Sequence, residues 1–192
     1  MVTEADFISY TLKPHQIEFC TLHAQRMSDG AKTHSFKNDS LQNTEVYTTG
    51  KLGEFAIYKW LKENNFNVIH APFRDTYQKF DKRDDFQIKT SKGIRQIEVR
   101  CKTRNFNPAI NWDVCSDCIK PALDYLFVSF NRKTQQISIL GWATFNIWAL
   151  YGKETRKGDT NNNFRHKVNE FNLPIQHLMP MELYKQFVKE EL

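Results

Sequence analysis

The sequence predicts an α/β protein in which helices flank a mixed β-sheet. Helical patterns occupy the first third of the chain, strand patterns fill its middle, and a short helical pattern lies near its end. The chain has 192 residues, of which 40% are hydrophobic and 14% aromatic, so one domain can bury a substantial core. We therefore expect residues 1–192 to form a single domain.

Two helices are expected before the strands. Residues 14–27 repeat small and apolar side chains at helical spacing, and Pro14 suits a first helical turn. Residues 52–64 give the second helix a broad apolar surface. The intervening residues 28–49 are polar, so we expect them to form a long loop.

The middle of the chain predicts a sheet of four or five strands. Its candidates are residues 66–69, 86–89, 94–103, 125–130 and 136–142. Residues 72–84 are expected to form a charged connection, and residues 85–102 a hairpin across the turn at 91–93. Residues 125–130 are almost wholly apolar and should be a central strand. Beyond residue 143 the pattern weakens, with a loop expected at 159–163 and a short helix at 181–190.

Charge and apolar content limit the class of partner. The net charge of +5 favours a polyanion such as a nucleic acid. No run of about 18 apolar residues is present, so we expect no membrane-spanning helix. The first residues include acids and lack a continuous apolar stretch, which predicts no secretory signal and a cytoplasmic location.

The four cysteines give little evidence of a metal or redox site. Cys115 and Cys118 form a CxxC pair, but no second pair completes a zinc site, although Cys101 is a candidate for a further ligand in space. We expect free thiols in a reducing compartment.

A one-sided charge pattern marks the expected hairpin. Along residues 94–103, Glu98, Arg100 and Lys102 share one face, opposite the apolar one. Asp85 lies at the mouth of the partner strand, where opposed positions are roughly 5 Å apart, and its neighbour Asp84 is a rival for the same role. Two carboxylates at this spacing suit Mg²⁺, and the backbone carbonyl of Val99 is a candidate third ligand. An ordinary solvated sheet face remains the alternative.

The chain resembles the PD-(D/E)xK nuclease superfamily. The matching residues are Asp85 followed by Glu98-Val99-Arg100, with residues 50–68 resembling the preceding helix and residues 124–144 the following strand pair. The resemblance covers about residues 50–145. It implies a restriction-endonuclease-like core, as in restriction and phage-encoded members, and a Mg²⁺-dependent endonuclease acting on DNA, with Mn²⁺ able to substitute.

The resemblance also implies roles for individual residues. Asp85, Glu98 and Glu54 are expected to hold metal, and Arg100 or Lys102 to position the nucleophile or balance charge. The basic edge expected to contact nucleic acid comprises Lys51, Lys89, Lys92, Arg104 and Asn105.

One departure from the family's pattern leaves alternatives open. The family has Lys where this chain has Arg100, and Arg cannot act as a base. A catalytically inactive nucleic-acid-binding protein of the same fold is therefore the second hypothesis. RNA as the substrate is a third, and a homodimer is expected if the protein cuts both strands of a duplex.

Overall fold

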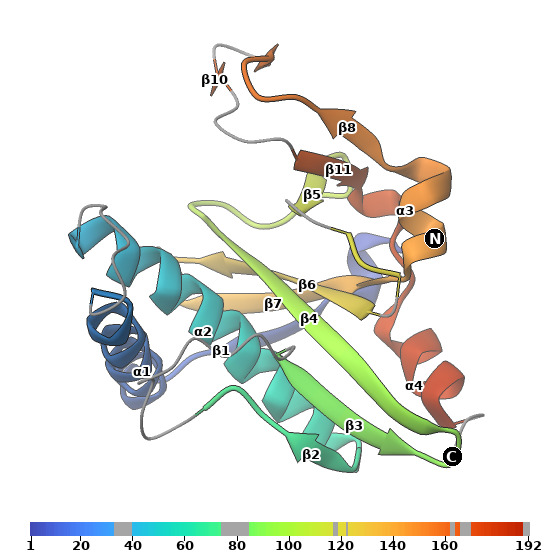
Figure 1. The fold of residues 1–192 in the computed structure, drawn as a ribbon, viewed down its shortest axis with the longest axis horizontal. Helices are drawn as coiled ribbons and strands as arrows, with labels where there is room; N and C mark the ends of the chain where they lie inside the picture. Colours follow the sequence, from blue (N-terminus) through green and yellow to red (C-terminus); the bar gives the residue numbers. More distant parts are fainter. Residues whose placement is uncertain are drawn as a thin grey trace.

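The computed structural model of the chain describes the backbone of residues 1–32, 40–73, 85–116, 119–121, 123–161, 164–165 and 170–189. Within these ranges, side chains are described outside residues 30–32, 40–43, 160–161 and 164–165. The described part is an α/β fold with a mixed, curled sheet and flanking helices, as the sequence predicts (Figure 1). None of the described helices is long and apolar enough to cross a membrane.

Six strands form the main sheet in the spatial order β1-β7-β6-β4-β3-β2. Only β4 and β6 pair in parallel, whereas the other neighbours are antiparallel. The strands are β1 (Ile8–Thr11), β2 (Val68–His70), β3 (Phe86–Thr90), β4 (Gly93–Arg104), β6 (Leu123–Asn131) and β7 (Gln136–Ala143). The expected β3–β4 hairpin is confirmed, and β6 is buried along its whole length, as its apolar sequence predicts.

Three helices cover one face of this sheet. α1 (Pro14–Lys32) packs on α2 (Ser40–Glu63), and α2 crosses the sheet over β4 (Figure 1). The C-terminal helix α4 (Met181–Lys189), expected from the sequence, joins the same apolar core through side chains such as Tyr184.

A second layer covers the other face. It contains α3 (Phe145–Tyr151) and a small sheet of β5 (Asp113–Ser116), β8 (Lys153–Thr155) and β11 (Glu170–Pro174), in the order β5-β11-β8. Trp148 of α3 packs against Tyr125 and Phe127 of β6. The short elements are η1 (Glu4–Asp6), η2 (Ile175–His177), β9 (Thr160–Asn161) and β10 (Phe164–Arg165).

The long loop expected at residues 28–49 is wrong, because α1 continues to Lys32 and α2 begins at Ser40. Packing of α1 against α2 stabilises the polar first turns of α2, and local polarity does not reveal this packing. Within these turns the hydroxyl of Thr48 donates to the Thr44 carbonyl at 2.8 Å, and that of Thr49 donates to the Glu45 carbonyl at 3.1 Å, so both hydroxyls are satisfied inside the helix.

The expected strand count is also too low. β1 pairs with β7 as an edge strand, and its four residues are too few for a clear alternating pattern. The region after residue 143, where the sequence pattern is weak, forms α3, and the expected loop at 159–163 includes β9. The charged connection expected at 72–84 lies mostly outside the described residues.

Candidate functional site

The position of α2 over β4 is fixed by one close backbone approach. A Cβ atom at Gly53 would lie 2.5 Å from the Cβ of Cys101, so only glycine fits here without movement of the chain. Val99 is the next contact, with its Cγ1 at 3.4 Å from the same point. The following residue of α2, Glu54, is thereby held beside β4.

The edge of β4 opens where its pairing with β3 ends. The last paired residues toward this end are Phe86 and Ile97, so Asp85 and Glu98 come next on the two strands. The backbone N–H of Val99 is therefore not paired with β3. It donates instead to Oδ2 of Asp85, at 2.7 Å. This bond holds the Asp85 carboxylate against β4, at the residue that follows Glu98.

A buried ion pair lies on the α2 side of this edge. Lys51 Nζ is 2.5 Å from Glu54 Oε2, and the two residues are only 3% and 8% exposed. The same ammonium donates to the Pro72 carbonyl at 3.2 Å. Lys51 was expected at the nucleic-acid surface, but its burial makes it a partner of the acids instead.

A second ion pair lies on β4 itself. Arg100 Nη2 is 3.2 Å from Glu98 Oε1, and both side chains are partly buried. Strand alternation turns these two residues away from Val99, which faces α2, so they approach the edge from the opposite side of the sheet. We call Glu54, Asp85 and Glu98, with Lys51 and Arg100, the acid cluster.

The pKa values connect the two sides of the cluster. Burial raises the pKa of Asp85 to about 7, and the negative charge of Glu54 adds to the rise, while the Val99 N–H, Lys51 and Arg100 oppose it. Burial also raises the pKa of Glu54, which Lys51 lowers and the charge of Glu98 raises. The pKa of Asp85 therefore depends on charges from α2 and β4, and that of Glu54 on charges from the same two elements.

The donor set is suited to a hard cation, but it does not form a closed cage. Among the residues that the structure describes, no group of three or more His, Cys, Asp or Glu side chains is arranged to hold a metal ion. Mg²⁺ needs only one or two protein carboxylates, because water and substrate phosphates complete its shell. Asp85 and Glu98, the first residues beyond the last β3–β4 pair, are the candidate ligands at this edge.

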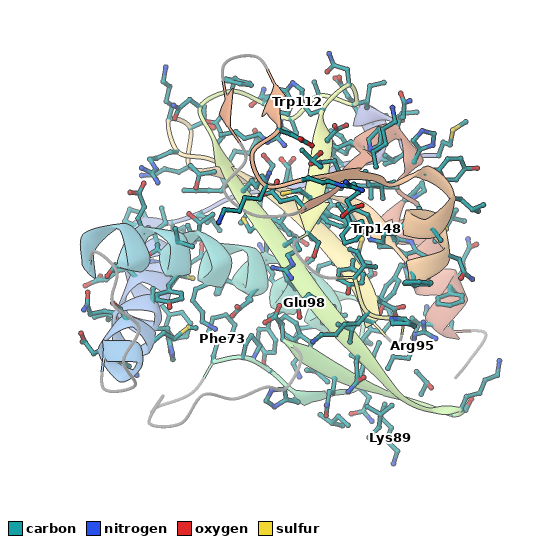
Figure 2. The ribbon with its side chains drawn as sticks, turned by 45° about the horizontal axis from the view of Figure 1, so that its top comes forward. Phe73, Lys89, Arg95, Glu98, Trp112 and Trp148 are labelled. Atoms are coloured by element: carbon teal, nitrogen blue, oxygen red, sulfur yellow. The ribbon has the colours of Figure 1, made fainter. Side chains whose placement is uncertain are left out.

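The aromatic ring of Phe73 lies against the buried Lys51, a contact that the sequence does not predict. The ring centroid of Phe73 lies 5.7 Å from Lys51 Nζ, and Phe73 packs against Phe19, Phe55 and Tyr58 (Figure 2). The i,i+3 spacing of Lys51 and Glu54 within one helix was the available signal for their pairing. Nothing in the local sequence indicated that Phe73 returns to this helix.

The remaining predicted contact residues lie along β3 and β4. Lys89, Lys92, Lys102 and Asn105 are exposed, whereas Arg104 is half-buried. Asp84, a rival of Asp85 in the sequence, lies outside the described residues, as does Cys118 of the CxxC pair. Cys20, Cys101 and Cys115 are free thiols, and burial raises the pKa of Cys20 to about 12, so that thiol is a poor nucleophile at neutral pH.

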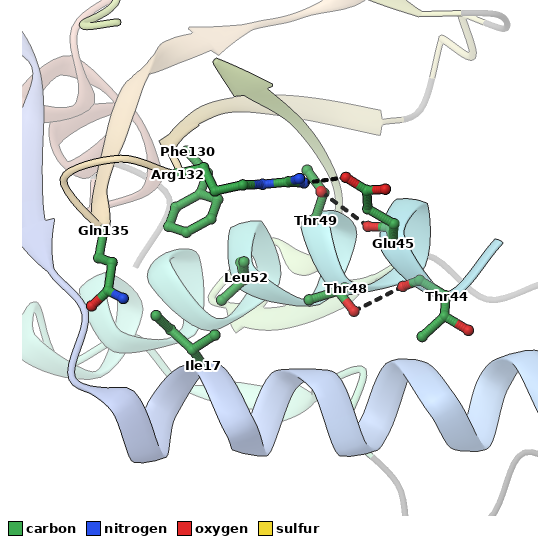
Figure 3. A pocket seen from close by; sticks show the side chains of 9 residues that line it. All are labelled: Ile17, Thr44, Glu45, Thr48, Thr49, Leu52, Phe130, Arg132 and Gln135. Carbon is green, nitrogen blue, oxygen red and sulfur yellow. Dashed lines mark hydrogen bonds and ion pairs between the residues drawn. The ribbon is translucent and has the colours of Figure 1, made fainter. Parts of the chain in front are cut away.

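A cavity of about 420 Å³ lies apart from the acid cluster, between α1, α2 and the β6–β7 turn (Figure 3). Its walls include Ile17, Leu52 and Phe130, and an ion pair between Arg132 and Glu45 lies at its side. None of the cluster residues lines this cavity, so it is not part of the candidate site.

Comparison of the chain with protein-family models, with curated proteins and with solved structures finds no significant match. The acid cluster and the resemblance of its residues to a nuclease motif are therefore the features that bear on function.

Proposed function

We propose that this protein is a Mg²⁺-dependent nuclease that hydrolyses phosphodiester bonds in DNA. The observation that carries the proposal is the acid cluster. Three carboxylates and two cations from α2, β4 and the residue before β3 are linked there by two ion pairs, by one hydrogen bond to the backbone and by their influence on one another's pKa values. Grouped carboxylates are costly in a folded protein unless a bound cation or a function compensates them.

The chain's own residues would divide the work. Asp85 and Glu98 present carboxylate oxygens to a Mg²⁺ ion, and Glu54 holds a second ion or orients its water. The Val99 carbonyl is a further oxygen donor on the same strand. A bound Mg²⁺ would supply an activated water and charge stabilisation for the leaving oxygen. Because Mg²⁺ and Mn²⁺ both accept oxygen ligands, Mn²⁺ is expected to substitute.

The two cations have different tasks. Arg100 stays protonated and is held beside Glu98, so it is placed to bind the scissile phosphate rather than to remove a proton. Lys51 is buried against Glu54 and balances charge behind the metal ligands. Lys102 lies one alternation further along β4 and is exposed, where it can contact the next phosphate.

The order of elements supports a restriction-endonuclease-like core. Helix α2 precedes the β3–β4 hairpin in the chain. β6 then pairs in parallel with β4, and β7 follows as its antiparallel neighbour. This is the order in which residues 50–145 resemble the nuclease superfamily. The acids lie on the hairpin and on the preceding helix, as the resemblance implies.

A non-catalytic nucleic-acid-binding protein is the second candidate, and the two ion pairs favour it. Glu54 is already neutralised by Lys51, and Glu98 by Arg100. If these pairs persist when nucleic acid binds, the carboxylates cannot take up metal. The net charge of +5 would then serve binding alone.

A plasmid-nicking assay with Mg²⁺, Mn²⁺ or EDTA separates the two candidates. The nuclease proposal expects metal-dependent nicking that disappears in Asp85→Ala and Glu98→Ala. Glu182→Ala, which removes an exposed acid on α4, is the matched control and should nick at the wild-type rate. Binding without nicking in any metal would favour the second candidate, and full nicking by Asp85→Ala would exclude the proposed site.

A further inference from the structure

The end of β4 carries a stack of one cation on two aromatic rings. The guanidinium carbon of Arg104 lies 4.1 Å from the ring centroid of Trp112. The rings of Trp112 and Phe106 are 4.8 Å apart and meet edge to face at 72°. Arg104 Nη2 also donates to the Asp113 carbonyl at 3.3 Å, which fixes the guanidinium in place. We call Arg104, Phe106 and Trp112 the aromatic stack.

The outer ring of this stack faces solvent. Phe106 is 61% exposed, more than any other aromatic side chain that the structure describes. A lone exposed phenylalanine is common on protein surfaces. Phe106 differs because its ring packs against Trp112, which in turn carries the guanidinium of Arg104 on its face, so an exposed ring and a positive charge share one support.

The aromatic stack lies at and just beyond the end of β4, the strand that also carries Glu98 and Arg100 of the acid cluster. Every second residue of β4 points to the same face, which carries Glu98, Arg100, Lys102 and Arg104. The distance from Glu98 to Arg104 is roughly 20 Å at 3.3 Å per residue. Figure 2 shows Glu98 between Lys89 and Trp112. A polyanion that crosses the acid cluster would therefore meet Arg100 and Lys102 before it reaches Phe106.

Rigid aromatic faces beside cations are what single-stranded nucleic acids bind. An unpaired base offers its face to such a ring, whereas the bases of an intact duplex already stack on one another. We infer that the aromatic stack holds an unpaired base of DNA, so that the preferred ligand carries a single-stranded segment next to the acid cluster. The link to cleavage rests on the proposed nuclease function, but the binding of the base does not.

Binding to labelled oligonucleotides tests this inference without any cleavage. Fluorescence anisotropy is measured in EDTA with three DNA ligands: a blunt duplex, the same duplex with a short single-stranded thymidine tail, and a tail of equal length whose sugars carry no bases. The thymidine tail should tighten binding at least about 5-fold over the other two, the lower end of the range for stacking one base.

Substitutions at Phe106 identify the surface responsible. Phe106→Ala should abolish the gain from the thymidine tail while leaving blunt-duplex affinity unchanged, and Phe106→Trp should retain the gain. Phe145→Ala, which removes another exposed aromatic ring on α3, is the matched control and should bind as wild type does. Equal binding of the thymidine and base-free tails, or an undiminished gain in Phe106→Ala, would overturn the inference.

Intrinsic fluorescence gives an independent readout. Trp60, Trp142 and Trp148 are at most 4% exposed, so Trp112 is the one partly exposed tryptophan of the four. The thymidine tail should quench this fluorescence and the base-free tail should not. Tighter binding of a ribonucleotide tail than of the DNA tail would overturn the assignment to DNA. If the wild-type protein does not nick plasmid DNA but still binds the thymidine tail through its bases, the nuclease proposal is rejected and the base-binding inference stands.

Discussion

Asp85 accepts a 2.7 Å hydrogen bond from the backbone N–H of Val99, at the point where β3 no longer pairs with β4. The carboxylate thus takes the place of a strand carbonyl, because it accepts the bond from a backbone N–H that has no partner on β3. It is also the most centrally placed acid of the cluster, because Glu54, Lys51 and Arg100 all influence its pKa. One side chain therefore has both a structural and an electrostatic role, and substitution can separate the two.

Asp85→Asn is expected to keep the fold and abolish the chemistry. The amide oxygen can still accept the bond from Val99, whereas the negative charge that would bind Mg²⁺ is lost. We expect nicking to fall at least about 100-fold, the scale on which loss of one catalytic electrostatic group acts. Asp85→Ala should have a free energy of unfolding about 1–3 kcal/mol lower than that of Asp85→Asn, because the Val99 N–H loses its acceptor.

Asp6→Asn provides the control for that comparison. Asp6 also accepts a backbone bond, from the Thr3 N–H at 2.7 Å, but lies outside the acid cluster. Its substitution should leave nicking unchanged. If Asp85→Asn nicks DNA as fast as Asp6→Asn does, the charge of Asp85 has no part in the reaction.

The stability of the protein should fall as pH rises toward neutrality. The pKa of Asp85 is raised from 3.8 to about 7 in the folded protein by burial and by the charge of Glu54. Between these two values the folded protein keeps a proton that the unfolded chain has released, so this carboxyl destabilises the fold progressively from about pH 4 to pH 7 and no further above it. Glu54, whose pKa is also raised, acts in the same direction.

Urea unfolding at pH 4.5 and pH 8 measures this effect. The wild type should lose more stability between the two pH values than Asp85→Asn does, because the amide does not titrate. The comparison needs no catalytic activity. Identical pH dependence of the two unfolding midpoints would show that the Asp85 carboxyl titrates near its ordinary range.

The parts of the site that could be predicted are those set by the pattern of neighbouring residues in the sequence. The alternation of Glu98 and Arg100 on β4, and the hairpin that brings Asp85 opposite, follow from strand periodicity over a few residues. The closure of the site by Phe73, and the depth at which Lys51 is buried, depend on contacts between segments far apart in the sequence. Periodicity carries no information on such contacts.

The same distinction explains the errors in the fold. β6 was predictable because a strand buried on both faces is apolar throughout. The first turns of α2 were not, since their polar residues are helical through packing against α1. β1 is an edge strand of four residues whose partner, β7, lies more than a hundred positions along the chain.

Lys51→Met should destabilise the protein strongly and more at high pH than at low pH. The substitution leaves Glu54 buried without its partner, which typically costs about 3–5 kcal/mol. At low pH Glu54 can take up a proton, so the loss is smaller there. The double variant Lys51→Met/Glu54→Gln should recover most of the stability, because it removes the orphaned charge.

Thermal or urea unfolding of the single and double variants gives the coupling between the two residues. Lys59→Met, which breaks an exposed pair with Glu63 at 3.8 Å on the same helix, is the matched control and should change stability by less than about 1 kcal/mol. Equal effects of the Lys51 and Lys59 substitutions would contradict the buried pairing.

Arg100 stands where the PD-(D/E)xK nucleases, which the chain resembles, have lysine, and substitutions at this residue test its role. Arg100→Ala should reduce nicking about 100-fold, because the cation beside Glu98 is lost from the place where charge develops. Arg100→Lys should stay within about tenfold of wild type, since it keeps the charge but not the planar fork. Rates of all three proteins are compared at saturating Mg²⁺. A fully active Arg100→Ala would assign charge balance in the cluster to Lys51 alone, because Lys51 is the other cation that influences Asp85.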